Sequence, residues 1–237
     1  MLQRGTLHAI DGTDARAVVI TRDAWNARMS SVGMVPLAST AATHGFLAPL
    51  GEGSGLAFDV TGLVTVPRGR IGEALAVIDD GVLHGIERAA SALLDAERIL
   101  ADPPRASRLP AGPIDYPRCG EIRYLVGERI DGEAKRYLVV SNDRWNQRRR
   151  TVLVVRTTAQ TKRPFEEFPL IHDGAAQVVC GELTAIPAAA VELRRRPPGM
   201  NRVGLLEFAA VLRGCSFTHM LRDHLDPFEV EIANGLE

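Results

Sequence analysis

The chain has 237 residues, 46% of them apolar, which is enough to bury the core of one large domain or two small ones. This composition excludes a disordered chain, and no apolar run reaches the roughly 18 residues of a membrane span. The N-terminus lacks the apolar segment of a signal peptide, and the three cysteines show no metal-ligand spacing. We therefore expect free thiols, a cytoplasmic location, and neither a metal nor a cofactor.

The net charge of −1 conceals an uneven distribution of charge along the chain. Residues 118–214 carry 17 Lys and Arg against 11 Asp and Glu, a net of +6, whereas residues 215–237 carry a net of −4. A basic module beside an acidic tail favours an anionic partner for the module. From charge alone, a solvated basic face is an equal alternative.

The first half of the chain is predicted to be rich in strands and to end in a helix. Strand patterns cover residues 6–10, 17–20 and 32–37, and residues 56–66 are rich in β-formers up to a proline at 67. Apolar residues then recur at helical spacing over about 82–98. Five prolines between 101 and 117 predict a stiff linker, because proline fixes φ and removes a backbone donor.

The second half repeats this order. Strands are expected at 121–126, 136–140, 151–157, 165–171 and 177–186, with a turn at 127–133 and a helix over about 202–214. A constant offset of 120 residues relates the halves: Asp23, Trp25 and Asn26 match Asp143, Trp145 and Asn146, and further matches run to Ala90 and Ala210. We interpret this as a tandem duplication, in which the Trp-Asn pair forms a core anchor and a turn rather than a base-stacking platform.

The second copy resembles the PemK/MazF family of bacterial toxins. The resemblance rests on Gly120-Glu121-Ile122, on Arg136 heading a Leu-Val-Val strand with Ser141-Asn142-Asp143 after it, and on Thr157-Thr158 followed by Gln160. It covers about residues 118–215 and, weakly, 3–98. The family implies an SH3-like barrel, usually as a homodimer, and cleavage of single-stranded RNA without a metal. Two copies in one chain would form an intramolecular pseudo-dimer, and an antitoxin protein would be a partner.

The resemblance also implies the residues of the site. The catalytic pair of the family maps onto Arg136 and Thr158. Arginine stays protonated, so its part in proton transfer comes from the resemblance alone. Without the resemblance, Arg136 would more simply be a surface salt-bridge residue. The two runs of arginines, at 148–150 and 194–196, would then be solvated faces. The RNA-binding positions are Thr157, Gln160, Lys162, Arg163, Arg148 and Glu182.

The first copy lacks most of this polar set. It keeps Arg16, but Leu37 and Ala38 replace the two threonines, and Pro36 and Gly62 stand opposite Arg156 and Glu182. The first copy is therefore predicted to be structural, leaving one working site. The second copy also departs from the family: Tyr137 replaces the usual proline, and Glu182 would repel a phosphate unless it serves as an acid, a base or a reader of base edges.

These observations predict a mainly β protein with α-helices, built as two small barrels that each end in a helix. The expected domains are a degenerate copy at 1–100, the linker at 101–117, the copy with the site at 118–216, and an acidic tail at 217–237. The leading hypothesis is a toxin-like endoribonuclease. The alternatives are a catalytically inactive binding protein on the same scaffold, with nucleic acid or an antitoxin as its partner, and a CcdB-like toxin directed at gyrase.

Overall fold

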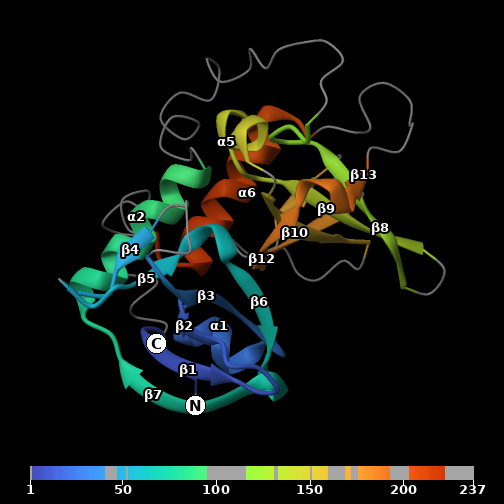
Figure 1. The fold of residues 1–237 in the computed structure, drawn as a ribbon. Helices are drawn as coiled ribbons and strands as arrows, with labels where there is room; N and C mark the ends of the chain where they lie inside the picture. Colours follow the sequence, from blue (N-terminus) through green and yellow to red (C-terminus); the bar gives the residue numbers. More distant parts are fainter. Residues whose placement is uncertain are drawn as a thin grey trace. The chain divides into compact units, whose positions relative to one another are not determined.

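The structure is a computed structural model, and two compact units make up the chain (Figure 1). It describes residues 2–40, 47–51, 53–94, 116–130, 133–149, 151–159, 169–171, 176–192 and 203–221. The first unit comprises residues 1–92 with 216–237, and the second comprises residues 93–215. Antiparallel sheets dominate both units and helices accompany them, which confirms the predicted β-barrel-plus-helix class.

The first unit is built on a seven-stranded sheet with the order β4-β5-β3-β2-β1-β7, to which β6 adds by pairing with β3. In Figure 1, β7 curves along the outer side of β1. Its elements are β1 (Thr6–Ile10), β2 (Arg16–Val19), α1 (Asp23–Arg28), β3 (Ser31–Ser39), β4 (Leu47–Pro49), β5 (Leu56–Asp59), η1 (Val60–Gly62), β6 (Val64–Pro67), η2 (Arg68–Arg70), β7 (Ile71–Val77) and α2 (Asp80–Leu94).

The second unit has a six-stranded sheet with the order β11-β12-β10-β9-β8-β13. Its elements are β8 (Ile122–Ile130), β9 (Glu133–Val139), α5 (Asp143–Arg148), β10 (Thr151–Thr158), β11 (Leu170–Ile171), β12 (Ala176–Pro187), η3 (Ala188–Ala190), β13 (Val191–Glu192) and α6 (Leu205–Thr218). The last three residues of α6 fall in the first unit, and the last two of α2 fall in the second. No helix in the described part of the chain is long and apolar enough to span a membrane.

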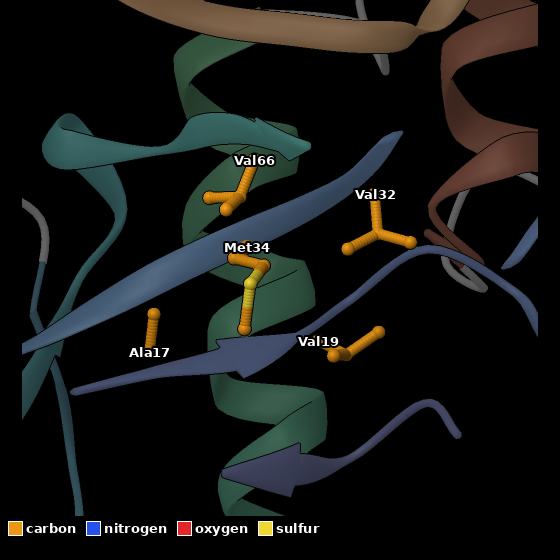
Figure 2. Close-up of a cluster of buried hydrophobic side chains, with 5 residues drawn as sticks. All are labelled: Ala17, Val19, Val32, Met34 and Val66. Carbon is orange, nitrogen blue, oxygen red and sulfur yellow. The ribbon is translucent and has the colours of Figure 1, made fainter. Parts of the chain in front are cut away.

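Equivalent residues form a hydrophobic cluster in each unit. Figure 2 shows the cluster of the first unit, in which β2, β3 and β6 contribute buried side chains: Ala17, Val19, Val32, Met34 and Val66. In the second unit, Val139, Val152, Val154 and Ile186 lie at the same positions plus 120, with Val191 beside them and Tyr137 packed against them. Burial of apolar surface is the main favourable term in folding, so the offset seen in the sequence corresponds to a shared core.

A buried hydrogen-bond network also recurs in the two units. In the second unit, Ser141 Oγ donates to Asn146 Oδ1 at 2.5 Å, and Asn146 Nδ2 donates to the Ser141 carbonyl at 2.9 Å. The backbone N–H of Leu153 donates to Ser141 Oγ at 2.9 Å. Thr21, Asn26 and Gly33 make the same three contacts in the first unit, at 2.6, 2.8 and 3.2 Å. The network ties the end of one strand to a short helix and to the next strand.

The segments predicted as turns after β2 and β9 are six-residue helices, α1 and α5. Trp25 and Trp145 are buried in them and donate from Nε1 to the carbonyls of Ser31 and Thr151, which confirms their role as core anchors. At the start of α5, Asn142 Oδ1 accepts from the Trp145 N–H at 2.8 Å, as an N-cap residue does. Six residues carry too few apolar positions to show a helical period.

Two further differences concern strands. Strands β8 and β9 extend through most of the predicted turn at 127–133, leaving only residues 131–132 between them. Strand β7 was not predicted, because five of its seven residues are exposed and it lacks the alternation of a half-buried strand. The described part of the predicted strand at 165–171 is β11, and residues 160–168 lie outside the described residues. The three cysteines are free and buried, as predicted.

The Asn146→Ala variant should lower the free energy of unfolding by about 1–3 kcal/mol, because it leaves buried groups of Ser141 without a hydrogen-bond partner. Urea denaturation followed by circular dichroism measures this change. The matched control is Gln147→Ala, which alters an exposed residue of the same helix and should have an effect within about 0.5 kcal/mol. An equally small effect of Asn146→Ala would show that the network does not hold the unit together.

Candidate functional site

Arg136 lies in a row of directly opposed residues that crosses three strands of the second unit. It pairs with Tyr124 on β8 and with Thr157 on β10. The hydroxyl of Thr157 donates to the Arg136 carbonyl at 3.2 Å. Directly opposed residues of antiparallel strands present their side chains on the same face of the sheet, so the three side chains share one face. Tyr124 and Thr157 are buried and Arg136 is half-buried.

Thr158, the second residue of the predicted catalytic pair, lies on the other face of this strand. Successive side chains alternate along a strand, so Thr158 points away from the face of Thr157 and Arg136. Thr158 is half-buried and is opposed by Gln177 on β12. The register therefore opposes Arg136 to Thr157 and puts Thr158 on the face that carries Arg156.

Arg156 and Glu182 form an ion pair on the face of Thr158. The Arg156 Nε lies against Glu182 Oε2, and Nη2 donates to Oε1 at 2.9 Å. The register of β10 with β12 up to Val155 brings Arg156 next to Glu182, and the ladder becomes irregular at that point. Val155 opposes Leu183 and Arg156 opposes Val179, which leaves residues 180–182 in a bulge. The sequence suggested that Glu182 would repel a phosphate, but Arg156 offsets its charge.

The other predicted RNA-binding residues lie partly within the described structure. Arg148 is exposed at the end of α5, and Arg149 follows it with its guanidinium 5.1 Å from the centre of the Trp145 ring. A cation over an aromatic face is attracted by the ring quadrupole, which holds this basic side chain at the surface. Residues Gln160, Lys162 and Arg163, the arginine run at 194–196 and the tail from 222 lie outside the described residues.

The first unit carries an apolar version of the same row. Ala9 opposes Arg16 on the β1 side, and the register of β2 with β3 brings Leu37 opposite Arg16 on the other side. The arginine remains, exposed, while its tyrosine and threonine neighbours are replaced by alanine and leucine.

The counterpart of the ion pair in the first unit is a close contact between two uncharged residues. A Cβ placed on Gly62 would lie 2.8 Å from the Pro36 ring, so glycine is needed where the second unit has Glu182. The two units therefore differ at both positions of the ion pair, which are Pro36 and Gly62 in the first unit and Arg156 and Glu182 in the second.

Two residues of the site were missed from the sequence. Tyr124 went unnoticed because only strand register shows that it faces Arg136. Arg156 was noted only as the counterpart of Pro36, and its pairing with Glu182 depends on the register of β10 with β12. The sequence did carry a signal for this pairing, because the two positions change together between the halves of the chain. They are Pro36 and Gly62 in the first half and Arg156 and Glu182 in the second.

No metal site is evident among the described residues, where no three His, Cys, Asp or Glu side chains come together. Arg136 is half-buried opposite Thr157, whereas Arg148 and Arg149 are exposed just before β10; each of these arginines can bind an anionic ligand through charge-assisted hydrogen bonds. The site can therefore hold a phosphate near Arg136 and a hydrogen-bond donor near Glu182.

Comparison with known proteins gives structural likeness only. No protein-family model matches the chain, and no curated protein matches it. The chain is similar to an endoribonuclease in complex with its cognate antitoxin, from a mycobacterial species, with 18% identity and a TM-score of 0.34 over 38% of this chain and 90% of that one. It is also similar to a mycobacterial endoribonuclease, with 16% identity and a TM-score of 0.38 over 46% of this chain and 96% of that one. Likeness of this degree does not assign an activity.

The Gly62→Ala variant should destabilise the first unit by about 1–3 kcal/mol, because the added methyl group overlaps the Pro36 ring. The loss is measured from the shift of the urea midpoint at constant slope. Pro36→Ala in the same chain should recover part of it, since residues in contact couple energetically.

Gly69→Ala is the control for this variant, because a Cβ at Gly69 meets no atom within 4 Å. Equal effects of the two glycine variants would contradict the close contact between Gly62 and Pro36.

Proposed function

We propose that this chain is a toxin-like endoribonuclease of the PemK/MazF type that cleaves single-stranded RNA without a metal. The working site is in the second unit, and the first unit is a structural copy. The observation that supports this best is the row around Arg136, which has polar neighbours in the second unit and apolar ones in the first. The chain is proposed to arise by tandem duplication, to form a pseudo-dimer of its two copies, and to have an antitoxin protein as a partner.

The proposed reaction is an internal transesterification. The ribose 2′-oxygen attacks the adjacent phosphorus, its proton passes to a base, and the bond from phosphorus to the 5′-oxygen breaks as that oxygen is protonated. The products are a 2′,3′-cyclic phosphate and a free 5′-hydroxyl. Arg136 stabilises the negative charge that develops on the phosphate, and Thr158 donates a hydrogen bond to the substrate. A role of Arg136 in proton transfer rests on the family resemblance.

The remaining predicted residues would hold the RNA strand. Arg148, Lys162 and Arg163 would neutralise phosphates, while Thr157 and Gln160 would position the backbone near Arg136. Arg148 is exposed at the end of its helix, where a phosphate can reach it.

A second candidate function is RNA binding without catalysis. The observation that favours it is the strand register, because Thr157 rather than Thr158 is opposed to Arg136. An enzyme needs its catalytic groups within reach of the same reacting atoms. Two groups on opposite faces of a strand can reach the same atoms only if the substrate passes around the end of that strand.

Cleavage of a mixed-sequence RNA in the presence of EDTA tests the proposal. The Arg136→Ala variant should lose about 10²–10³-fold in rate, and Thr158→Ala should also lose activity, because each removes a hydrogen-bond donor to the reacting phosphate. The matched control is Arg16→Ala, the same substitution 120 residues earlier, which should leave the rate unchanged. Binding of RNA without cleavage by the unmodified protein would favour the binding protein. If the unmodified protein neither binds nor cleaves RNA, both functions are excluded.

RNA affinity should fall steeply with salt, because each neutralised phosphate releases counterions. For a single strand, the slope of log affinity against log salt should flatten by about 0.7 in Arg148→Ala, which removes one phosphate contact. Fluorescence anisotropy with a labelled RNA at several salt concentrations measures this slope. Arg28→Ala, at the matching position of the first unit, should keep the original slope. Affinity that does not respond to salt would contradict a phosphate-binding surface.

A further inference from the structure

The ion pair of Arg156 and Glu182 has the geometry of a braced hydrogen-bond acceptor. Two nitrogens of one guanidinium engage the two oxygens of the carboxylate, which fixes the plane and direction of the carboxylate. The side chains remain 36% and 19% exposed, so a ligand can reach them. A surface pair held only for stability would contribute little, since solvent and salt screen exposed ion pairs.

The position of the pair connects it with the proposed site. Glu182 lies at the edge of a bulge in β12, and bulges are over-represented next to active sites. Arg156 and Thr158 are two residues apart on β10, so their side chains lie on the same face of the sheet. The braced carboxylate therefore faces the same side as the proposed catalytic threonine.

The first unit has no equivalent of this group. Its counterparts are Pro36 and Gly62, which approach each other so closely that no side chain fits at position 62 without movement. The core cluster and the Asn network persist in the first unit, so the ion pair is not required for this fold. The pair is confined to the unit that carries the polar row around Arg136.

The chemistry of the carboxylate selects the ligand. A carboxylate only accepts hydrogen bonds and has about four lone-pair positions. Among the described residues, Arg156 Nη2 donates to Oε1 and Nε lies against Oε2, so the carboxylate has further lone-pair positions that can accept from a ligand. The oxygens of a phosphodiester have no proton to donate to it, whereas the exocyclic amino group of cytosine, adenine or guanine would donate to it. In uracil the single imino N–H lies between two carbonyl oxygens, which a carboxylate repels.

We propose that Glu182, held by Arg156, recognises a nucleobase with an exocyclic amino group next to the cleaved phosphate. Glu182 contacts the base, and Arg156 is a positioning residue that acts through Glu182. This inference rests on the proposed function, since it identifies the RNA that the same site accepts. It goes further in naming a determinant of sequence choice and the class of base selected.

The experiment uses the full-length protein and a pool of RNA randomised in sequence. Cleavage sites are mapped by sequencing, and bound RNA is sequenced as well, so that base preference is measured even without cleavage. The unmodified protein should disfavour uracil at one position near the cut or contact site. Glu182→Gln is nearly isosteric and introduces an amide donor that can pair with a carbonyl oxygen. It should reduce the discrimination against uracil by about tenfold.

Arg156→Ala should reduce the same discrimination, because the carboxylate loses its brace. Arg156→Lys should retain part of it, since a lysine supplies charge without the planar fork. Arg28→Ala, on the exposed surface of the first unit, should keep the original preference. Circular dichroism spectra and urea midpoints of all variants show whether each one is folded.

The possible outcomes separate this inference from the function on which it rests. If the protein cleaves or binds RNA and Glu182→Gln retains the original base preference, the role of the ion pair is wrong and the proposed function stands. If the protein neither cleaves nor binds RNA, both are wrong. A loss of discrimination in Glu182→Gln and Arg156→Ala at the same position, with partial retention in Arg156→Lys, supports the inference.

Discussion

The buried hydrogen bonds of Asn146 constrain the way the chain passes from β9 to β10 in the second unit. The Asn146 side chain joins Ser141, at the end of β9, to the start of β10, where the Leu153 N–H donates to Ser141 Oγ. Buried polar groups are costly unless they are paired, so these bonds restrict the way the chain can pass from one strand to the next. A slip of one residue would exchange the two faces of a strand. The network is consistent with the register that opposes Arg136 to Thr157, although it contains neither residue.

The same framework supports two different surfaces. Both units keep the Asn network and a valine-rich cluster at equivalent positions. The residues opposite the arginine differ, however: they are Tyr124 and Thr157 in the second unit, and Ala9 and Leu37 in the first. Where the second unit has its ion pair, the first has a close contact of Gly62 with the Pro36 ring. Packing and site chemistry are thus separable in this chain, because the residues of the two hydrophobic clusters are not those of the row or of the ion pair.

Strand alternation has a direct bearing on the chemistry. The family resemblance pairs Arg136 with Thr158, whereas the sheet opposes Arg136 to Thr157 and gives Thr158 the neighbourhood of Arg156 and Glu182. The site therefore has two parts on the two faces of β10. One part is cationic and suited to a phosphate, and the other contains an acceptor that Arg156 orients.

The sequence by itself determined the fold class, most strands, the two long helices and the core anchors, because periodicity and a constant offset of 120 depend only on the order of residues. It also singled out Arg136, the two threonines and Glu182 as a candidate set. Only the tertiary structure decided which of them face each other, since register and a bulge depend on pairing between distant segments. The partnership of Glu182 with Arg156 follows from the register of β10 with β12, and strand alternation places Thr158 on the same face.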